Sequence, residues 1–134
     1  MKTGLVLEGG AMRGIYTAGV LDIFNENKIK VDGVIGVSAG CVHGVNYISE
    51  QNGRSIRYTL KYRNDKRYMS VKSLLKTGNM VETDFCYHEI PEKLDPFDNN
   101  TYMKSGIDFY TVSSNVETGR AEYLKCKDVF KQID

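Results

Sequence analysis

The chain has few of the features that mark several common protein classes. No apolar run is long enough to cross a membrane, and the run after Lys2 meets Glu8 before it reaches the length of a signal-peptide core. Three cysteines about forty residues apart fit neither a disulfide framework nor a zinc site, and two histidines are too few for a His-rich metal centre. A net charge of +1 argues against a general nucleic-acid-binding surface. We therefore expect a cytoplasmic protein without metal or cofactor and with no nucleic-acid partner.

The hydrophobic pattern predicts a single α/β domain over residues 1–134. Hydrophobic residues make up 41% of the chain, which is enough for a core. Apolar runs at 3–7 and 34–37 predict central parallel strands, and helical patterns follow them at 15–25 and 41–48. Right-handed crossovers in such units bring the loops after both strands to the same edge of the sheet.

Two further elements are expected in this arrangement. Tyr16, Val20, Ile23 and Phe24 form a helix face that should pack on the sheet. Strands at 107–113 and 119–124 are separated by a turn with Gly119 at its exit, which predicts a hairpin, and a last helix begins at Asp128.

The chain is organised around Gly36-Val37-Ser38-Ala39-Gly40. A strand that turns into a helix within one residue crowds the backbone, and Gly36 and Gly40 remove side chains on either side of the turn. Ser38 then lies at the exposed tip, as in the nucleophile elbow G-x-S-x-G. An N-cap serine is the structural alternative for the same position.

A glycine-rich loop, Gly9 to Gly14, follows the first strand and begins the first helix. Bare backbone N–H groups at a helix N-terminus favour negative charge, so this loop is suited to a phosphate or to the oxyanion formed when a serine attacks an ester. The candidate oxyanion-hole residues are Gly9, Gly10, Ala11 and Arg13, with the N–H groups of Gly10 and Ala11 as the principal donors. We expect Arg13 to fix the loop, with a smaller role in touching a substrate phosphate.

Three other polar residues near these motifs have structural explanations. His43 lies about 140° around its helix from Ser38, so we expect it to face solvent or a hydrogen-bond partner. Asp32 lies about 20 Å from Ser38 along an extended strand and should mark the strand entry at the opposite edge. Glu8 should cap its own loop or pair with Arg13, because a carboxylate beside a developing oxyanion would oppose the reaction. His88 has no identifiable partner.

The middle of the chain carries two stretches of opposite charge. Residues 54–76 are rich in Lys and Arg with interleaved tyrosines, and residues 80–100 are rich in Asp and Glu. The favoured interpretation is two solvated faces that attract each other. A basic and aromatic surface for anionic lipid headgroups is the functional alternative.

The two glycine-containing motifs together resemble the patatin-like phospholipases. The resemblance rests on Leu7 to Gly14 and Gly36 to Gly40 and continues through 62–68, 74–79 and 93–98. It implies a three-layer α/β/α fold with a mostly parallel central sheet, and a serine lipid acyl hydrolase with Ser38 as nucleophile. Many members have a third glycine where this chain has Ala11, so we expect a negative φ there.

The resemblance also implies a Ser–Asp dyad, whose aspartate lies in a later Asp-Gly-Gly or Asp-Gly-Ala motif. The chain ends at Asp134 before such a motif, so we expect it to lack the C-terminal portion of the fold and to be nearly inert by itself. Phospholipid or another acyl-ester lipid is the implied substrate, with possible contact to a membrane surface. An uncovered sheet edge is expected to cause self-association.

Two other functions remain open. A non-catalytic lipid- or protein-binding relic of the same fold would also lack the base. The loop Gly9-x-Ala11-x-x-Gly14 is one residue from a dinucleotide-binding fingerprint, but that motif requires an acid at the end of the second strand, where this chain has Ser38.

Overall fold

The computed structural model describes residues 1–68 and 81–133, and these divide into two compact units. The first unit combines residues 1–55 with 98–134, and the second comprises residues 56–97. The expected 74–79 motif and part of the basic stretch lie outside the described residues. The single-domain assignment stays a prediction.

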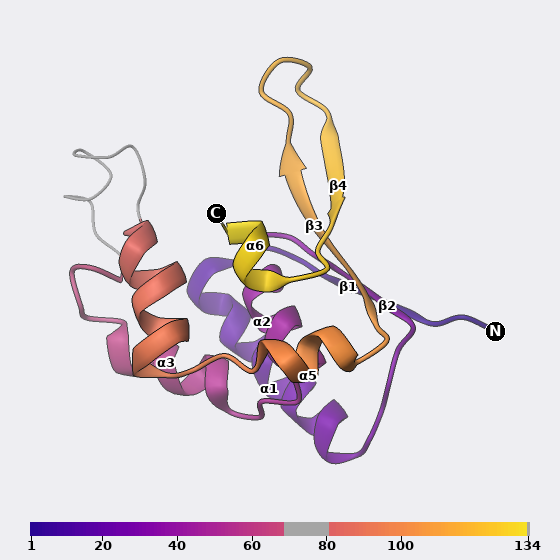
Figure 1. The fold of residues 1–134 in the computed structure, drawn as a ribbon, viewed down its shortest axis with the longest axis horizontal. Helices are drawn as coiled ribbons and strands as arrows, with labels where there is room; N and C mark the ends of the chain where they lie inside the picture. Colours follow the sequence, from indigo (N-terminus) through magenta and orange to yellow (C-terminus); the bar gives the residue numbers. More distant parts are fainter. Residues whose placement is uncertain (69–80, 134) are drawn as a thin grey trace. The chain divides into compact units, whose positions relative to one another are not determined.

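The first unit is built on a four-stranded mixed sheet in the order β1-β2-β3-β4 (Figure 1). Its strands are β1 (Gly4–Leu7), β2 (Gly33–Gly36), β3 (Asp108–Ser114) and β4 (Ala121–Lys125). The first three strands run parallel, and β4 is antiparallel to β3. The predicted α/β class with a mostly parallel sheet is therefore confirmed.

One face of this sheet forms the core of the first unit. Leu7, Val34 and Phe109 are buried on it, and the elbow helix α2 (Ala39–Ile48) packs against them. A Cβ on Gly44 would already lie 3.1 Å from the Phe109 ring, so this glycine allows the helix to approach the strands closely. On the opposite face Val6 is 73% exposed.

Helix α1 (Ile15–Glu26) corrects the expected packing. Its buried residues are Ala18 and Leu21, whereas Tyr16 and Ile23 of the predicted packing face are exposed. The helix packs on α2 and not through its Tyr16 side on the sheet. The sequence pattern is ambiguous because α1 carries apolar residues on both of these faces.

The predicted hairpin is confirmed in the second half of the unit. Tyr110 pairs with Lys125 and Ser114 with Ala121, and Gly119 takes a φ of +67° at the turn. That conformation favours glycine. Two short helices, α5 (Asn99–Lys104) and α6 (Val129–Ile133), flank β3 and β4 in the sequence.

The second unit contains most of α3 (Arg54–Tyr62) and a π-helix, η2 (Asp84–Leu94). Tyr62 and Phe85 form its aromatic core, with an edge-to-face contact at 5.3 Å between ring centroids. Pro91 lies inside this helix and has no backbone N–H to donate. The wide helical turn continues past it, because the Asp95 N–H donates a hydrogen bond to the Ile90 carbonyl oxygen.

Candidate active site

The turn between β2 and α2 has the geometry of a nucleophile elbow. Ser38 lies there with φ +50° and ψ −120°, a conformation that L-residues rarely adopt. A Cβ on Gly36 would come within 2.8 Å of the Cys41 backbone, and one on Gly40 within 2.3 Å of the Leu7 carbonyl oxygen. Only glycine fits at either position, so both glycines predicted for the elbow occupy positions that require them.

Ser38 itself is exposed and occupies the N-cap position of α2. Its hydroxyl makes no capping hydrogen bond to the helix, although the Cys41 N–H bonds the Ser38 carbonyl at 2.9 Å. Strained φ/ψ values persist only where the surroundings enforce them, and they are common at active sites. The N-cap role therefore does not explain this serine.

The glycine-rich loop lies directly beside Ser38. A Cβ on Gly9 would be 3.2 Å from the Ser38 Cβ and 3.4 Å from the Val37 carbonyl oxygen. The Val37 N–H bonds the Leu7 carbonyl at 3.0 Å, which joins the ends of the two parallel strands. Both loops therefore leave the sheet at the same edge, as the crossover rule requires.

Past Gly10 the loop becomes a short 3-10 helix, η1 (Ala11–Gly14), that leads into α1. The Arg13 N–H is already used in a 3.0 Å bond to the Gly10 carbonyl. The earlier N–H groups of Gly10 and Ala11 are the ones at the start of the helix, where orphan donors occur. This order favours them as oxyanion donors over the N–H of Arg13.

Ala11 departs from the expected conformation. Its φ is +46°, so the expected negative φ is wrong. A left-handed alanine costs about 1–2 kcal/mol relative to a favourable conformation, which the surrounding loop must offset. The preference for glycine at this position thus has a backbone cause, and this chain tolerates the strain.

Glu8 and Arg13 do not form the expected pair. Within the described residues neither side chain makes a hydrogen bond or an ion pair, and both are exposed. Backbone bonds and close packing hold the loop in place of side-chain charges. Both groups are therefore open to solvent.

His43 is buried, which corrects the expectation of a solvent-facing or hydrogen-bonded histidine. It is only 4% exposed, and its Nδ1 has no hydrogen-bond partner among the described residues. Burial lowers the pKa of His43, and the Asp22 carboxylate partly opposes this effect. The ring fits against Gly14, where a Cβ would come within 2.6 Å of Nε2. Apart from Gly14 itself, no pattern in the sequence indicates that His43 lies beneath the loop.

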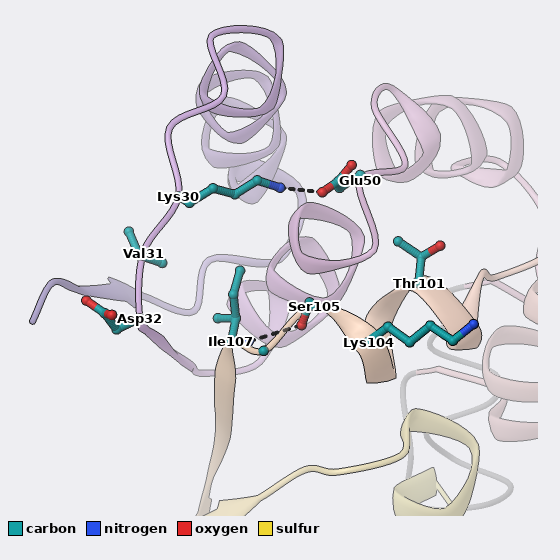
Figure 2. Close-up of a pocket in the computed structure, with 9 residues that line it drawn as sticks. Lys30, Val31, Asp32, Glu50, Thr101, Lys104, Ser105 and Ile107 are labelled. Carbon is teal, nitrogen blue, oxygen red and sulfur yellow. Dashed lines mark hydrogen bonds and ion pairs between the residues drawn. The ribbon is translucent and has the colours of Figure 1, made fainter.

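Asp32 lies at the other end of β2, as predicted. Its Oδ2 accepts hydrogen bonds from Thr3 N at 2.6 Å and Thr3 Oγ1 at 3.1 Å, and these bonds lower its pKa. A cavity of about 420 Å³ lies at this end (Figure 2), where Lys30 pairs with Glu50. Ser38 is absent from its lining, which consists of Lys30, Val31, Asp32, Glu50, Thr101, Lys104, Ser105, Gly106 and Ile107.

The charged stretches of the second unit pair with each other. Arg57 forms two 2.8 Å bonds with Asp95, and Arg67 contacts both Asp65 and Glu89. These contacts support mutual attraction over a free lipid-binding surface. His88 contacts Glu92 at 3.2 Å.

Two further features are absent from the described residues. No helix in this part of the chain is long and apolar enough to span a membrane. Nor do the described His, Cys, Asp and Glu side chains form a cluster suited to a metal ion.

The fold is α/β, with a glycine-flanked strand-to-helix turn at Ser38. The profile described as patatin-like phospholipase matches residues 5–122, and the chain belongs to this family of lipid acyl hydrolases. The chain is 29% identical over 113 residues to a protein of Escherichia coli (strain K12) named YjjU and described as uncharacterised. It is 28% identical over 114 residues to a neuropathy target esterase, sws, of Drosophila grimshawi.

The matched regions are unequal shares of these proteins. They cover 81% and 84% of this chain, but only 31% of YjjU and 8% of the esterase. The family therefore defines the fold and the chemistry of the class, while the activity of the longer proteins remains a separate question for this chain.

Proposed function

We propose that the chain carries the nucleophile and oxyanion hole of a serine lipid acyl hydrolase. The main supporting observation is how close the loop lies to the strained, exposed Ser38: a Cβ built on Gly9 would be 3.2 Å from the Ser38 Cβ. Gly36 and Gly40 hold the elbow, and the loop from Gly9 to Arg13 supplies the backbone donors.

In this proposal Ser38 Oγ attacks the carbonyl carbon of an acyl ester while its proton passes to a base. The carbonyl oxygen becomes an oxyanion that the N–H groups of Gly10 and Ala11 stabilise. Collapse of the tetrahedral intermediate releases the alcohol, which takes the proton, and leaves an acyl-Ser38 ester. Water then attacks this ester, the fatty acid leaves and Ser38 is restored.

None of the three described candidates near these motifs suits the role of the base. Asp32 lies at the far end of β2, and His43 is buried under the loop with its helix position turned away from Ser38. Glu8 is next to the loop, where its charge would oppose the oxyanion. We therefore assign the base to an aspartate outside these 134 residues, as in the Ser–Asp dyad of the family, and expect the chain by itself to be nearly inactive.

A fluorophosphonate probe tests this assignment. The 134-residue chain should label slowly at Ser38, and a longer version that continues past Asp134 should label much faster. Ser38→Ala should abolish labelling, whereas Ser113→Ala, at another exposed serine, and Asp32→Asn should leave it unchanged. Equal, rapid labelling of both lengths would place the base within the chain and contradict the assignment.

The proposed substrate is a phospholipid or another acyl-ester lipid, and the exposed Arg13 is available to a substrate phosphate. The neuropathy target esterase relative is consistent with ester chemistry. A cytoplasmic location and a peripheral contact with a membrane surface remain predictions. Self-association through an uncovered sheet edge, at the outer strands β1 or β4 of the described sheet, stays a prediction that an interface elsewhere would contradict.

A non-catalytic relic is the second candidate, and the missing base favours it. Such a protein would bind lipid or protein without turnover. Sedimentation with phospholipid vesicles separates the two functions if fatty-acid release is measured in the longer version. Binding without Ser38-dependent release would support the relic, and release that Ser38→Ala abolishes would exclude it.

A further inference from the structure

Helix α1 is apolar on two opposite faces, and only one of them is covered. Ala18 and Leu21 are buried against α2, whereas Tyr16 is 81%, Val20 37% and Ile23 54% exposed. At 100° per residue, these three positions lie opposite the buried pair. Three exposed apolar side chains on one helix face form a surface that a partner could cover.

The ends and the centre of this outer face have complementary features. Arg13 precedes the helix and Glu26 ends it, and among the described residues neither side chain has a hydrogen-bond or ion-pair partner. Gly19 lies halfway between them, and a Cβ built there meets nothing within 4 Å. The face thus combines one unpaired charge of each sign with a small residue at its midpoint.

We propose that this face binds α1 of a second copy in an antiparallel, two-fold arrangement. Arg13 then faces Glu26 of the second copy, Tyr16 faces its Ile23, and Gly19 faces its Val20. All three pairs share the same midpoint, between residues 19 and 20, so one rotation axis satisfies them together. Such an interface is isologous, as in most homodimers.

The physical contributions agree with this geometry. Gly19 allows the two helix backbones to approach closely at the crossing point, where larger side chains would hold them apart. The antiparallel arrangement places each helix N-terminus beside the C-terminus of the other. It also forms two symmetry-related ion pairs, each between Arg13 of one copy and Glu26 of the other. A lipid surface fits less well, because Asp22 and Glu26 on the same helix would repel anionic headgroups.

The inference is independent of the catalytic proposal, since it needs no reactivity at Ser38. It places the interface on α1 and not on a sheet edge. Because Arg13 belongs to the glycine-rich loop, each contact with Glu26 of the second copy would lie beside that loop. Catalytic activity is therefore not used as the readout.

Analytical ultracentrifugation of the purified chain tests the interface. We expect a monomer–dimer equilibrium for the wild type. Ile23→Glu should weaken it at least about tenfold, the effect of losing about 1.4 kcal/mol of binding free energy. Gly19→Arg should do the same without harming the monomer, because its side chain enters open space. Tyr123→Glu, a control at an exposed residue of β4, should leave the equilibrium unchanged.

A charge exchange makes the test specific. Arg13→Glu and Glu26→Arg should each weaken the dimer, and the double variant should restore it. A strict monomer at the highest soluble concentration, or a double variant no stronger than the single ones, would overturn the proposal. If only Tyr123→Glu dissociates the dimer, the interface lies at the sheet edge. If the chain binds anionic vesicles and forms no dimer, the face is a lipid surface. Either result would also overturn the proposed α1 interface.

Discussion

The two ends of the parallel sheet are built on opposite principles. At the amino end, Asp32 is held by two hydrogen bonds from Thr3, and Lys30 pairs with Glu50. At the carboxyl end, the Ser38 hydroxyl has no capping bond, and Ser38 and Ala11 both adopt positive φ. The same three strands therefore carry one end with satisfied polar groups and one with strained, unpaired groups.

The difference shows where the fold tolerates energetic cost. Polar pairing at the amino end stabilises the strand entries, while the carboxyl end relies on close backbone packing to hold groups that would be more stable elsewhere. That is the distribution expected when one end of a parallel sheet carries a ligand or reaction site.

Substituting a glycine by alanine should give the largest difference in unfolding free energy between the two ends. Gly40→Ala at the carboxyl end should lower the free energy of unfolding by roughly 3 kcal/mol, since its Cβ would lie 2.3 Å from the Leu7 carbonyl oxygen. Gly33→Ala at the amino end should change it by less than about 1 kcal/mol, because its Cβ would be 3.5 Å from the nearest atom. Urea denaturation measures both, and equal effects would remove the contrast.

Acid should weaken the two ends in different pH ranges. Burial lowers the pKa of His43 from 6.5, so its contribution to stability is complete above about pH 6.5 and is lost as the pH falls below it. The pKa of Asp32 is lowered from 3.8 by Thr3, so its contribution is lost only below that pH.

Unfolding free energies measured between pH 8 and pH 5 test the histidine part. Stability should fall with decreasing pH by at most about 1.4 kcal/mol per pH unit from this one proton. His43→Gln should flatten the profile. If His43→Gln leaves the pH profile unchanged, protonation of this ring does not lower the unfolding free energy.

The smallest effect concerns the strain at Ala11. Ala11→Gly should raise the unfolding free energy by about 0.5 kcal/mol, because relief of the left-handed conformation slightly exceeds the added entropy of the unfolded chain. Ala121→Gly, at a residue of β4 with no positive φ, should lower it. A loss of stability at Ala11 would mean that the loop does not strain this residue.

The sequence predicted the parts of the molecule that depend on local patterns. The strands end within two residues of their predicted limits, and the elbow glycines occupy positions that exclude a Cβ. These features follow from periodicity and from the few residues that a tight strand-to-helix turn accepts.

The errors lie where tertiary packing decides between locally equivalent choices. α1 has two apolar faces, so the pattern did not reveal that Ala18 and Leu21 would be buried instead of Tyr16 and Ile23. Helix geometry predicts that His43 points away from Ser38, but the burial of its ring depends on Gly14 from another element. The sign of φ at Ala11 and the absence of a Glu8–Arg13 pair likewise depend on the loop as a whole.

The central claim is that the oxyanion of a Ser38 adduct is bound by the amides of the glycine-rich loop. The most direct measurement is a ¹H–¹⁵N spectrum of the chain after complete phosphonylation of Ser38. The account predicts large downfield shifts for the Gly10 and Ala11 amide protons and small shifts for Thr3 and Asp32 at the other end. Unchanged Gly10 and Ala11 amides in the adduct would contradict it.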